Sequence, residues 1–97
     1  MSVRRMMGHW LIAGGRPKQI RAEGKVLFVS SGLLGVGEKA QETVKFWCEE
    51  RADEPYRRTF ATFRTGEPLP EEAVWHGSVE TAAGRVWHLF ELFGEET

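Results

Sequence analysis

The sequence predicts an all-β protein, a small antiparallel sandwich or open barrel of about seven strands. Glycine and proline interrupt the chain often, leaving segments of about 6 to 12 residues, a spacing typical of all-β domains. Several of these segments are rich in aromatic and β-branched residues, which fit a pleated, half-buried surface. A length of 97 residues and a hydrophobic share of 41% suit one core. We therefore expect a single domain over 1–97, frayed at 1–8 and at 95–97.

Three predicted strands lie in the first third of the chain. His9–Ala13 ends at a Gly-Gly pair that is followed by Pro17. Lys18–Ala22 lies between that turn and the next glycine, and Lys25–Ser30 follows. The glycine-rich segment 32–37 then predicts a surface loop. It does not match a phosphate-binding loop, because the nearest lysine is at a different position.

The segment from Lys39 to Ala52 allows two interpretations. Its apolar residues fall at helical spacing among good helix formers: Ala40, Val44, Trp47, Cys48 and Ala52. A strand fits best over 43–48, within a candidate strand Glu42–Glu50. An α+β fold with one helix near 39–52 is therefore the alternative to the all-β fold.

Three more strands are predicted in the second half. Tyr56–Arg64 ends at a turn containing Pro68 and Pro70, and Val74–Glu80 ends before an Ala-Ala-Gly turn. Arg85–Leu92 has both helical and alternating periodicity. The short interval between its flanking glycines favours a strand, because most helices are longer.

Composition excludes several classes of protein. The chain carries 13 lysine and arginine residues against 14 aspartate and glutamate residues, a net charge of −1. This balance provides no general basic field, so nucleic acid is not an expected partner. No apolar run approaches the roughly 20 residues of a membrane-spanning helix, and the start of the chain is too short in apolar residues for a signal peptide. With a single cysteine, we expect a protein of the reducing cytoplasm.

Charge is distributed unevenly along the chain. Residues 1–25 contain six basic residues against Glu23 alone, a net +5, whereas the remainder has seven basic and 13 acidic residues, a net −6. Complementary faces of one fold would explain this asymmetry. Head-to-tail self-association or a charged partner is the alternative.

Tryptophan supplies the first candidate binding residues. The chain has four, and strand alternation cannot place all of them inward together with the phenylalanines. Outward tryptophans are typical of protein interfaces and of stacking platforms. The predicted binding surface therefore contains three tryptophans and two adjacent histidines: Trp47, Trp75, Trp87, His76 and His88.

Two arginines complete the predicted surface. In a strand over Tyr56–Arg64, Arg58 and Arg64 share a face with Phe60. Arginine beside an aromatic ring suits an anionic or nucleotide-like ligand. The alternative is a cross-strand ion pair, for which the chain offers Glu42, Glu49 and Glu50.

No pattern predicts catalysis, a cofactor or a metal. His9, His76 and His88 each lie beside a tryptophan, and three imidazoles can bind zinc, but no spacing forces them together. Cys48 lies among apolar residues and is expected to be a packed side chain rather than a reactive thiolate. We therefore expect a protein that is not an enzyme.

The second half of the chain resembles a known family. The matching pieces are Lys45-Phe46-Trp47, Tyr56-Arg57-Arg58-Thr59-Phe60, Thr65-Gly66-Glu67-Pro68-Leu69 and Gly84-Arg85-Val86-Trp87-His88-Leu89-Phe90-Glu91. They resemble small proteins of unknown function encoded largely in bacteriophage and prophage genomes. The resemblance favours a strand at 43–48 and implies a bacterial host cell, and it brings no reaction or cofactor.

These observations define two expected functions. The first is a non-enzymatic, phage-type accessory binding protein that acts in the bacterial cytoplasm through a protein–protein interface, with a host or phage protein as partner. A homo-oligomer is also expected, because sheets expose strand edges. The alternative is a binder of a small anionic ligand, a nucleotide-type sponge or sensor that uses tryptophan and arginine side chains.

Overall fold

The computed structural model describes residues 4–51 and 57–93. Within these residues the chain forms seven strands and one turn of 3-10 helix, Gly37–Lys39. The strands are, in chain order, β1 (Arg4–Ile12), β2 (Lys18–Ile20), β3 (Glu23–Leu34), β4 (Gln41–Arg51), β5 (Arg58–Arg64), β6 (Ala73–Glu80) and β7 (Val86–Leu92). No helix in the described parts of the chain has the length and apolar character needed to cross a bilayer.

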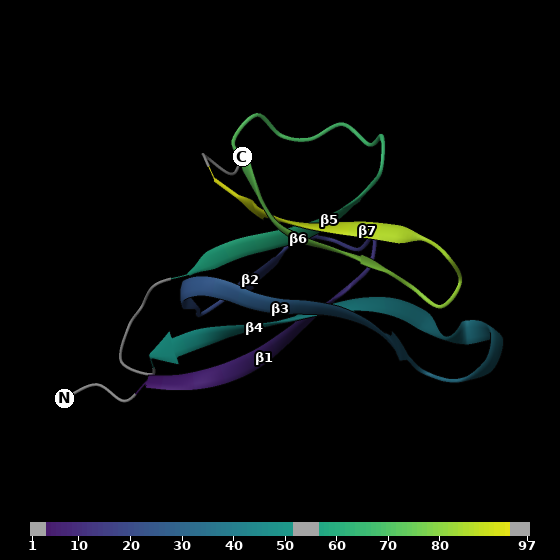
Figure 1. The fold of residues 1–97 in the computed structure, drawn as a ribbon, viewed down its shortest axis with the longest axis horizontal. Coiled ribbons are helices and arrows are strands. Elements are labelled where there is room, and N and C mark those ends of the chain that lie inside the picture. The colour runs from purple at the N-terminus through teal and green to yellow at the C-terminus, as the bar shows by residue number, and fades with distance from the viewer. Residues whose placement is uncertain (1–3, 52–56, 94–97) are drawn as a thin grey trace.

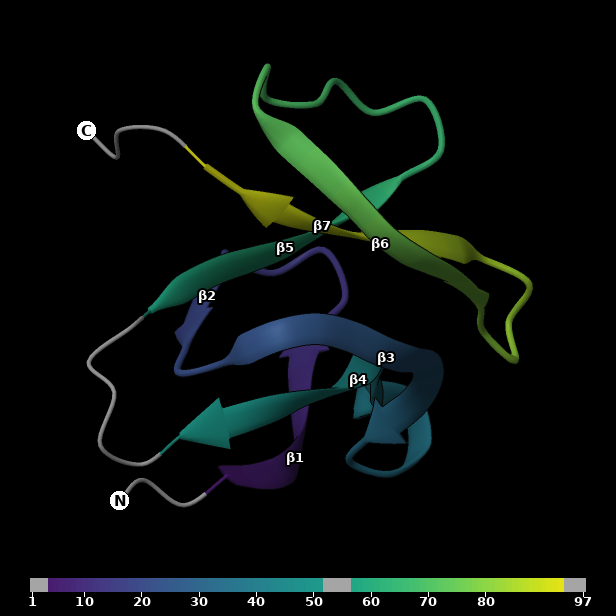
Figure 2. The ribbon, with the colours of Figure 1, turned by 60° about the vertical axis from the view of Figure 1, so that its left-hand side comes forward.

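The strands form two antiparallel sheets that pack as a sandwich (Figure 1). One sheet has the order β1-β4-β3 and the other the order β2-β5-β7-β6. Figure 2 shows the two layers from a second direction. β3 of one sheet and β6 of the other contact each other there. The all-β prediction is confirmed, and of the two predicted arrangements the sandwich is the one that forms.

The segment predicted as either helix or strand is strand β4. Val44, Phe46 and Cys48 are completely buried, while Lys45 between them is exposed. This two-residue alternation is that of a strand with one face on the core. The alternative helix near 39–52 is therefore wrong over the described residues. Its helical spacing depended on Trp47, which lies on the opposite face of β4 from Phe46.

Some element bounds differ from the predicted ones. β3 continues to Leu34, where it pairs with Gln41, so the predicted loop 32–37 begins later. β1 already starts at Arg4, within the segment expected to fray. The remaining expected frayed residues, 1–3 and 95–97, lie outside the described residues, as does the predicted start of β5 at Tyr56.

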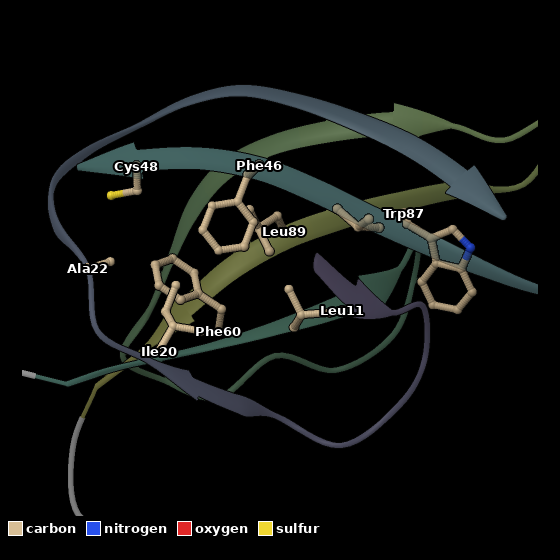
Figure 3. Packing of buried hydrophobic residues seen from close by; sticks show 9 residues of the cluster. Leu11, Ile20, Ala22, Phe46, Cys48, Phe60, Trp87 and Leu89 are labelled. Atoms are coloured by element: carbon tan, nitrogen blue, oxygen red, sulfur yellow. The ribbon is translucent and has the colours of Figure 1, made fainter. Parts of the chain in front are cut away.

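The core lies between the two sheets (Figure 3). Phe46 of β4 and Phe60 of β5 meet there with ring centroids 4.7 Å apart. Trp87 of β7 lies at one end of the cluster and is only 7% exposed. Its indole Nε1 donates to Glu42 Oε1 of β4 at 3.1 Å, which links the two sheets.

The sheets approach closely where β3 passes β6. A Cβ atom at Gly77 would lie 2.6 Å from Val29 Cγ2, so glycine is needed at this point. The register of β6 against β7 shifts between Trp75 and Gly77. The shift makes His76 an extra residue in β6, so that His76 and Gly77 both face the sandwich while Trp75 and Ser78 share the outer face.

Candidate binding surface

Aromatic side chains cover the outer face of the β5-β7-β6 sheet. Trp75 of β6 is directly opposite Phe90 of β7, and Phe63 of β5 is opposite His88 of β7. We call this surface the Trp75 face and define it by seven residues: Phe63, Thr65, Leu69, Trp75, Ser78, His88 and Phe90. Trp75 is 59% exposed. On β7, strand alternation places His88 and Phe90 on this face, because their neighbours Trp87, Leu89 and Glu91 point into the core.

A chain of hydrogen bonds holds Trp75 in position. Its Nε1 donates to Ser78 Oγ at 2.9 Å, and Ser78 Oγ lies 2.6 Å from His88 Nδ1. His88 Nε2 lies 2.8 Å from Thr65 Oγ1. Because an indole N–H can only donate, Ser78 Oγ is the acceptor of the bond from Trp75. The exposed indole is therefore held in place by its neighbours.

A shallow hollow adjoins this chain. Its volume is about 240 Å³, and Leu69, Phe63 and Phe90 contribute to its wall. The two phenylalanine rings meet edge to face, with centroids 5.6 Å apart. Arg64, Glu67 and His88 also line the hollow. A hollow with an apolar wall and a polar edge beside a fixed tryptophan can accept an apolar side chain of another protein.

Ser78 and His88 resemble a nucleophile and base in distance, but the third group differs from that of a catalytic triad. A triad uses a carboxylate to stabilise the imidazolium that forms. Here His88 contacts the neutral hydroxyl of Thr65. The arrangement is suited to positioning Trp75 rather than to activating Ser78.

Arg58, His76 and Glu91 form an ion cluster inside the sandwich. Arg58 Nε and Nη2 donate to the two carboxylate oxygens of Glu91 at 2.6 and 2.5 Å. His76 Nε2 lies 3.0 Å from Glu91 Oε1, and Arg58 Nη1 also donates to the Gly24 carbonyl at 2.7 Å. The Arg58 and Glu91 side chains are only 9% and 4% exposed. Burial raises the pKa of Glu91, but hydrogen bonds and charge from Arg58 and His76 outweigh it and lower the pKa below its usual value.

The predicted surface residues therefore separate into different places. Trp75 and His88 lie on the Trp75 face. Trp87, Arg58 and His76 point into the sandwich, which corrects their expected outward positions. Arg58 lies inside because its ion-pair partner, Glu91, is on the inner face of β7. The predicted cross-strand ion pair exists, but with Glu91 in place of Glu42, Glu49 or Glu50.

Arg64 and Trp47 occupy two further positions. Arg64 is exposed, with its guanidinium 5.9 Å from the Trp87 ring centroid, and it lines an open hollow together with Gly14 and Glu67. Trp47 lies half-buried on the outer face of the other sheet, with Lys45 Nζ 4.8 Å from its ring. Trp47 lies away from the Trp75 face, whereas Arg64 also lines the hollow that adjoins it.

Sequence reasoning missed five members of the Trp75 face: Phe63, Thr65, Leu69, Ser78 and Phe90. Alternation along β7 places Phe90 on the same face as His88, so the sequence pattern could have predicted that Phe90 belongs to this surface. Thr65 and Leu69 come from the β5–β6 connection, and no periodic pattern relates a turn to a sheet face.

The three histidines do not converge. His9 lies on β1 against Phe46, with ring centroids 5.6 Å apart, and burial lowers its pKa. Among residues 4–51 and 57–93, no group of three or more histidine, cysteine or acidic side chains is arranged to hold a metal. Cys48 is buried, its thiol donates to the Glu23 carbonyl at 3.2 Å, and burial raises its pKa. A protonated, enclosed thiol is a packing residue.

The fold and its surface define a small antiparallel β-sandwich with an aromatic outer face. The chain belongs to a family described as a domain of unknown function, DUF7352, whose model matches residues 12–97. The match includes all of the Trp75 face and leaves most of β1 outside it. No curated protein and no solved structure matches the chain.

Proposed function

We propose that this protein is a non-enzymatic binding protein and that its Trp75 face docks a partner protein. The observation that carries the proposal is the exposure of Trp75 together with the hydrogen bonds that fix it. A large aromatic side chain held in one conformation loses little entropy on binding. Such residues are the usual centres of protein interfaces.

The composition of the face supports a protein partner. Its centre is aromatic and apolar, and its hydroxyl and imidazole groups, on Thr65, Ser78 and His88, can make directional contacts. Protein interfaces combine an apolar centre with a polar rim in this way. The adjoining hollow of about 240 Å³ is smaller than most small-molecule sites, which measure roughly 300 to 1000 Å³.

The proposed setting is the bacterial cytoplasm, with a role of the phage accessory type. Support comes from the resemblance of residues 45–91 to small phage and prophage proteins. The partner is accordingly a host or phage protein. The single buried cysteine, which forms no disulfide among the described residues, agrees with a reducing compartment.

The test is affinity purification of the tagged protein from bacterial cells, with quantitative mass spectrometry of the proteins retained. Trp75→Ala is expected to reduce the retained partner at least about tenfold, because truncation of a central aromatic anchor typically has that effect. His88→Ala removes one link of the hydrogen-bond chain and should reduce it less.

Phe28→Ala is the matched control. Phe28 is an aromatic residue of β3, 72% exposed and on the other sheet, so its loss should leave the partner bound. Circular dichroism of each variant should show an intact fold, because none of the three side chains belongs to the buried core. A partner retained equally by wild type, Trp75→Ala and His88→Ala would overturn the proposal.

A further inference from the structure

A second exposed tryptophan, Trp10, lies on the outer face of the other sheet. Its β1 position is directly opposite Lys45 of β4, and its side chain is 42% exposed. Lys18 Nζ lies 4.7 Å from the Trp10 ring centroid and donates to the Trp10 carbonyl at 2.9 Å. The Lys18 ammonium of β2 therefore lies against this indole, and Lys45 of β4 is its neighbour on the adjacent strand.

Two hollows border Trp10. One, of about 460 Å³, lies toward the β1–β2 turn, where Arg16, Pro17 and Lys18 line it. The other, of about 280 Å³, lies toward β3, where Gly32, Thr43 and Lys45 contribute to it. Of the described residues that line these two hollows, three are cationic and none is acidic. We call Trp10, Arg16, Lys18 and Lys45 the Trp10 site.

Gly8 shapes the neighbouring surface. It is paired with Trp47, and a Cβ atom here would lie 2.9 Å from Trp47 Cζ3 and 3.1 Å from Lys45 Cε. The absent side chain lets the Trp47 ring and the Lys45 stem lie across β1. Lys45 Nζ is consequently held 4.8 Å from the Trp47 ring, on the sheet face that also carries Trp10.

We propose that the Trp10 site binds a nucleotide, with the base stacked on the Trp10 indole and the phosphate held by Lys18 and Arg16, which line the same hollow. Lys45, which lines the second hollow, adds positive charge beside the indole. An indole face stacks on any base, whereas lysine and arginine recognise the phosphate charge. A ligand that satisfies both must carry a planar ring and an anionic group a short distance apart. A nucleotide has this chemistry, either free in solution or as one unit of a single strand.

Charge complementarity supports an anionic ligand at this place. The net charge of the whole chain is −1, but the linings of the two hollows carry only positive charge among the residues described. Arg4, another basic residue of β1, is already paired with Glu49 at 2.6 Å. Arg16, Lys18 and Lys45, in contrast, line hollows to which no described carboxylate contributes.

The site is separate from the Trp75 face, which lies on the outer side of the opposite sheet. The nucleotide proposal does not rest on the proposed protein partner, and either can fail alone. A Trp75→Leu variant should bind nucleotide as the wild type does, and a Trp10→Leu variant should retain the protein partner.

The test uses adenosine 5′-monophosphate and a ten-nucleotide oligothymidylate as probes. In ¹H–¹⁵N NMR spectra each tryptophan indole N–H gives its own signal, and Trp10→Phe identifies that of Trp10. Titration should shift the Trp10 signal saturably and leave the Trp75 signal unchanged. Calorimetry should show binding about tenfold weaker for Trp10→Leu, the usual effect of losing one base–aromatic stack.

Further variants separate stacking from charge. Trp10→Phe should preserve most of the affinity, because a phenyl ring still stacks. Lys18→Gln and Lys45→Gln should each weaken binding and reduce its dependence on salt concentration. If the monophosphate and the oligonucleotide bind with similar affinity, the ligand is a free nucleotide. If the oligonucleotide binds much more tightly than the monophosphate, the ligand is a single strand. The proposal is overturned if neither probe shifts the Trp10 signal at millimolar concentration, or if Trp10→Leu binds as wild type.

Discussion

Glu91 is a carboxylate enclosed between two sheets, and it retains its charge because Arg58 and His76 surround it. Arg58 binds both of its oxygens, and His76 approaches one of them at 3.0 Å. Arg58 also lies over the Phe60 ring, 5.2 Å from its centroid. The cluster therefore connects β5, β6 and β7 to the aromatic core through a few charge-assisted contacts.

This cluster should make stability depend on pH in the acid range. The pKa of Glu91 is lowered in the folded state from its ordinary value of 4.5. Its contribution to stability is accordingly present above about pH 4.5 and is lost as the pH falls through the folded-state pKa. Urea unfolding measured between pH 7 and pH 3 should show this loss.

Glu91→Gln tests the assignment. The substitution leaves Arg58 buried without its counter-charge, and breaking such a pair costs about 3 to 5 kcal/mol. The variant should be less stable at pH 7 and should lose less stability on acidification than the wild type. An unfolding free energy equal to that of the wild type, with the same acid dependence, would contradict the role given to Glu91.

At the scale of elements, the contact between β3 and β6 determines how closely the sheets can pack. Gly77 of β6 leaves room for Val29 of β3, since a Cβ atom would lie 2.6 Å from Val29 Cγ2 and 3.1 Å from Val29 Cβ. A Ser31 hydroxyl that donates to the Glu80 carbonyl at 3.4 Å lies along the same seam. Two strands far apart in sequence thus close one side of the sandwich.

Gly77→Ala should destabilise the protein by about 1 to 3 kcal/mol, because the added methyl forces the two strands apart. Val29→Ala removes the methyl groups that the new Cβ atom would meet. The double variant should therefore be more stable than the sum of the two single effects predicts, which urea unfolding of the four proteins would show. Strictly additive effects would mean that the two residues do not compete for the same space.

At the scale of the molecule, most strand pairs join distant parts of the chain. β1 pairs with β4 in a register that places Arg5 opposite Glu50, and β2 pairs with β5. Of the five ladders described, β3–β4 and β6–β7 join strands that are consecutive in the chain, and the other three join strands that are not. Some of the uneven charge along the chain is also matched across such pairs, as by Arg4 and Glu49.

This topology predicts slow folding for so small a protein. Loops must close before distant strands can pair, and domains dominated by such contacts fold in about milliseconds to seconds. Stopped-flow refolding followed by tryptophan fluorescence should give a relaxation in this range, since Trp87 becomes buried only when both sheets are joined. Complete refolding within microseconds would contradict a rate set by distant pairing.

Local patterns were enough to predict the class of fold and the positions of the strands. Glycine and proline mark turns wherever they occur, and β-branched and aromatic residues favour strands, so both signals can be detected within a few residues. The conflict at 39–52 shows the limit of that range. Apolar residues at helical spacing were outweighed by neighbouring strands, which paired with β4 on both sides and buried Val44, Phe46 and Cys48 together.

Tertiary packing decided which side of each strand faces the core and which partner each charge receives. Alternation divides β7 into two faces, but both carry aromatic residues, so the sequence could not show that Trp87 is buried while Phe90 lies on the outer face. Arg58 could have paired with several carboxylates, and only the β5–β7 register placed Glu91 beside it. These outcomes depend on strands brought together from distant positions, and neither periodicity nor composition contains that information.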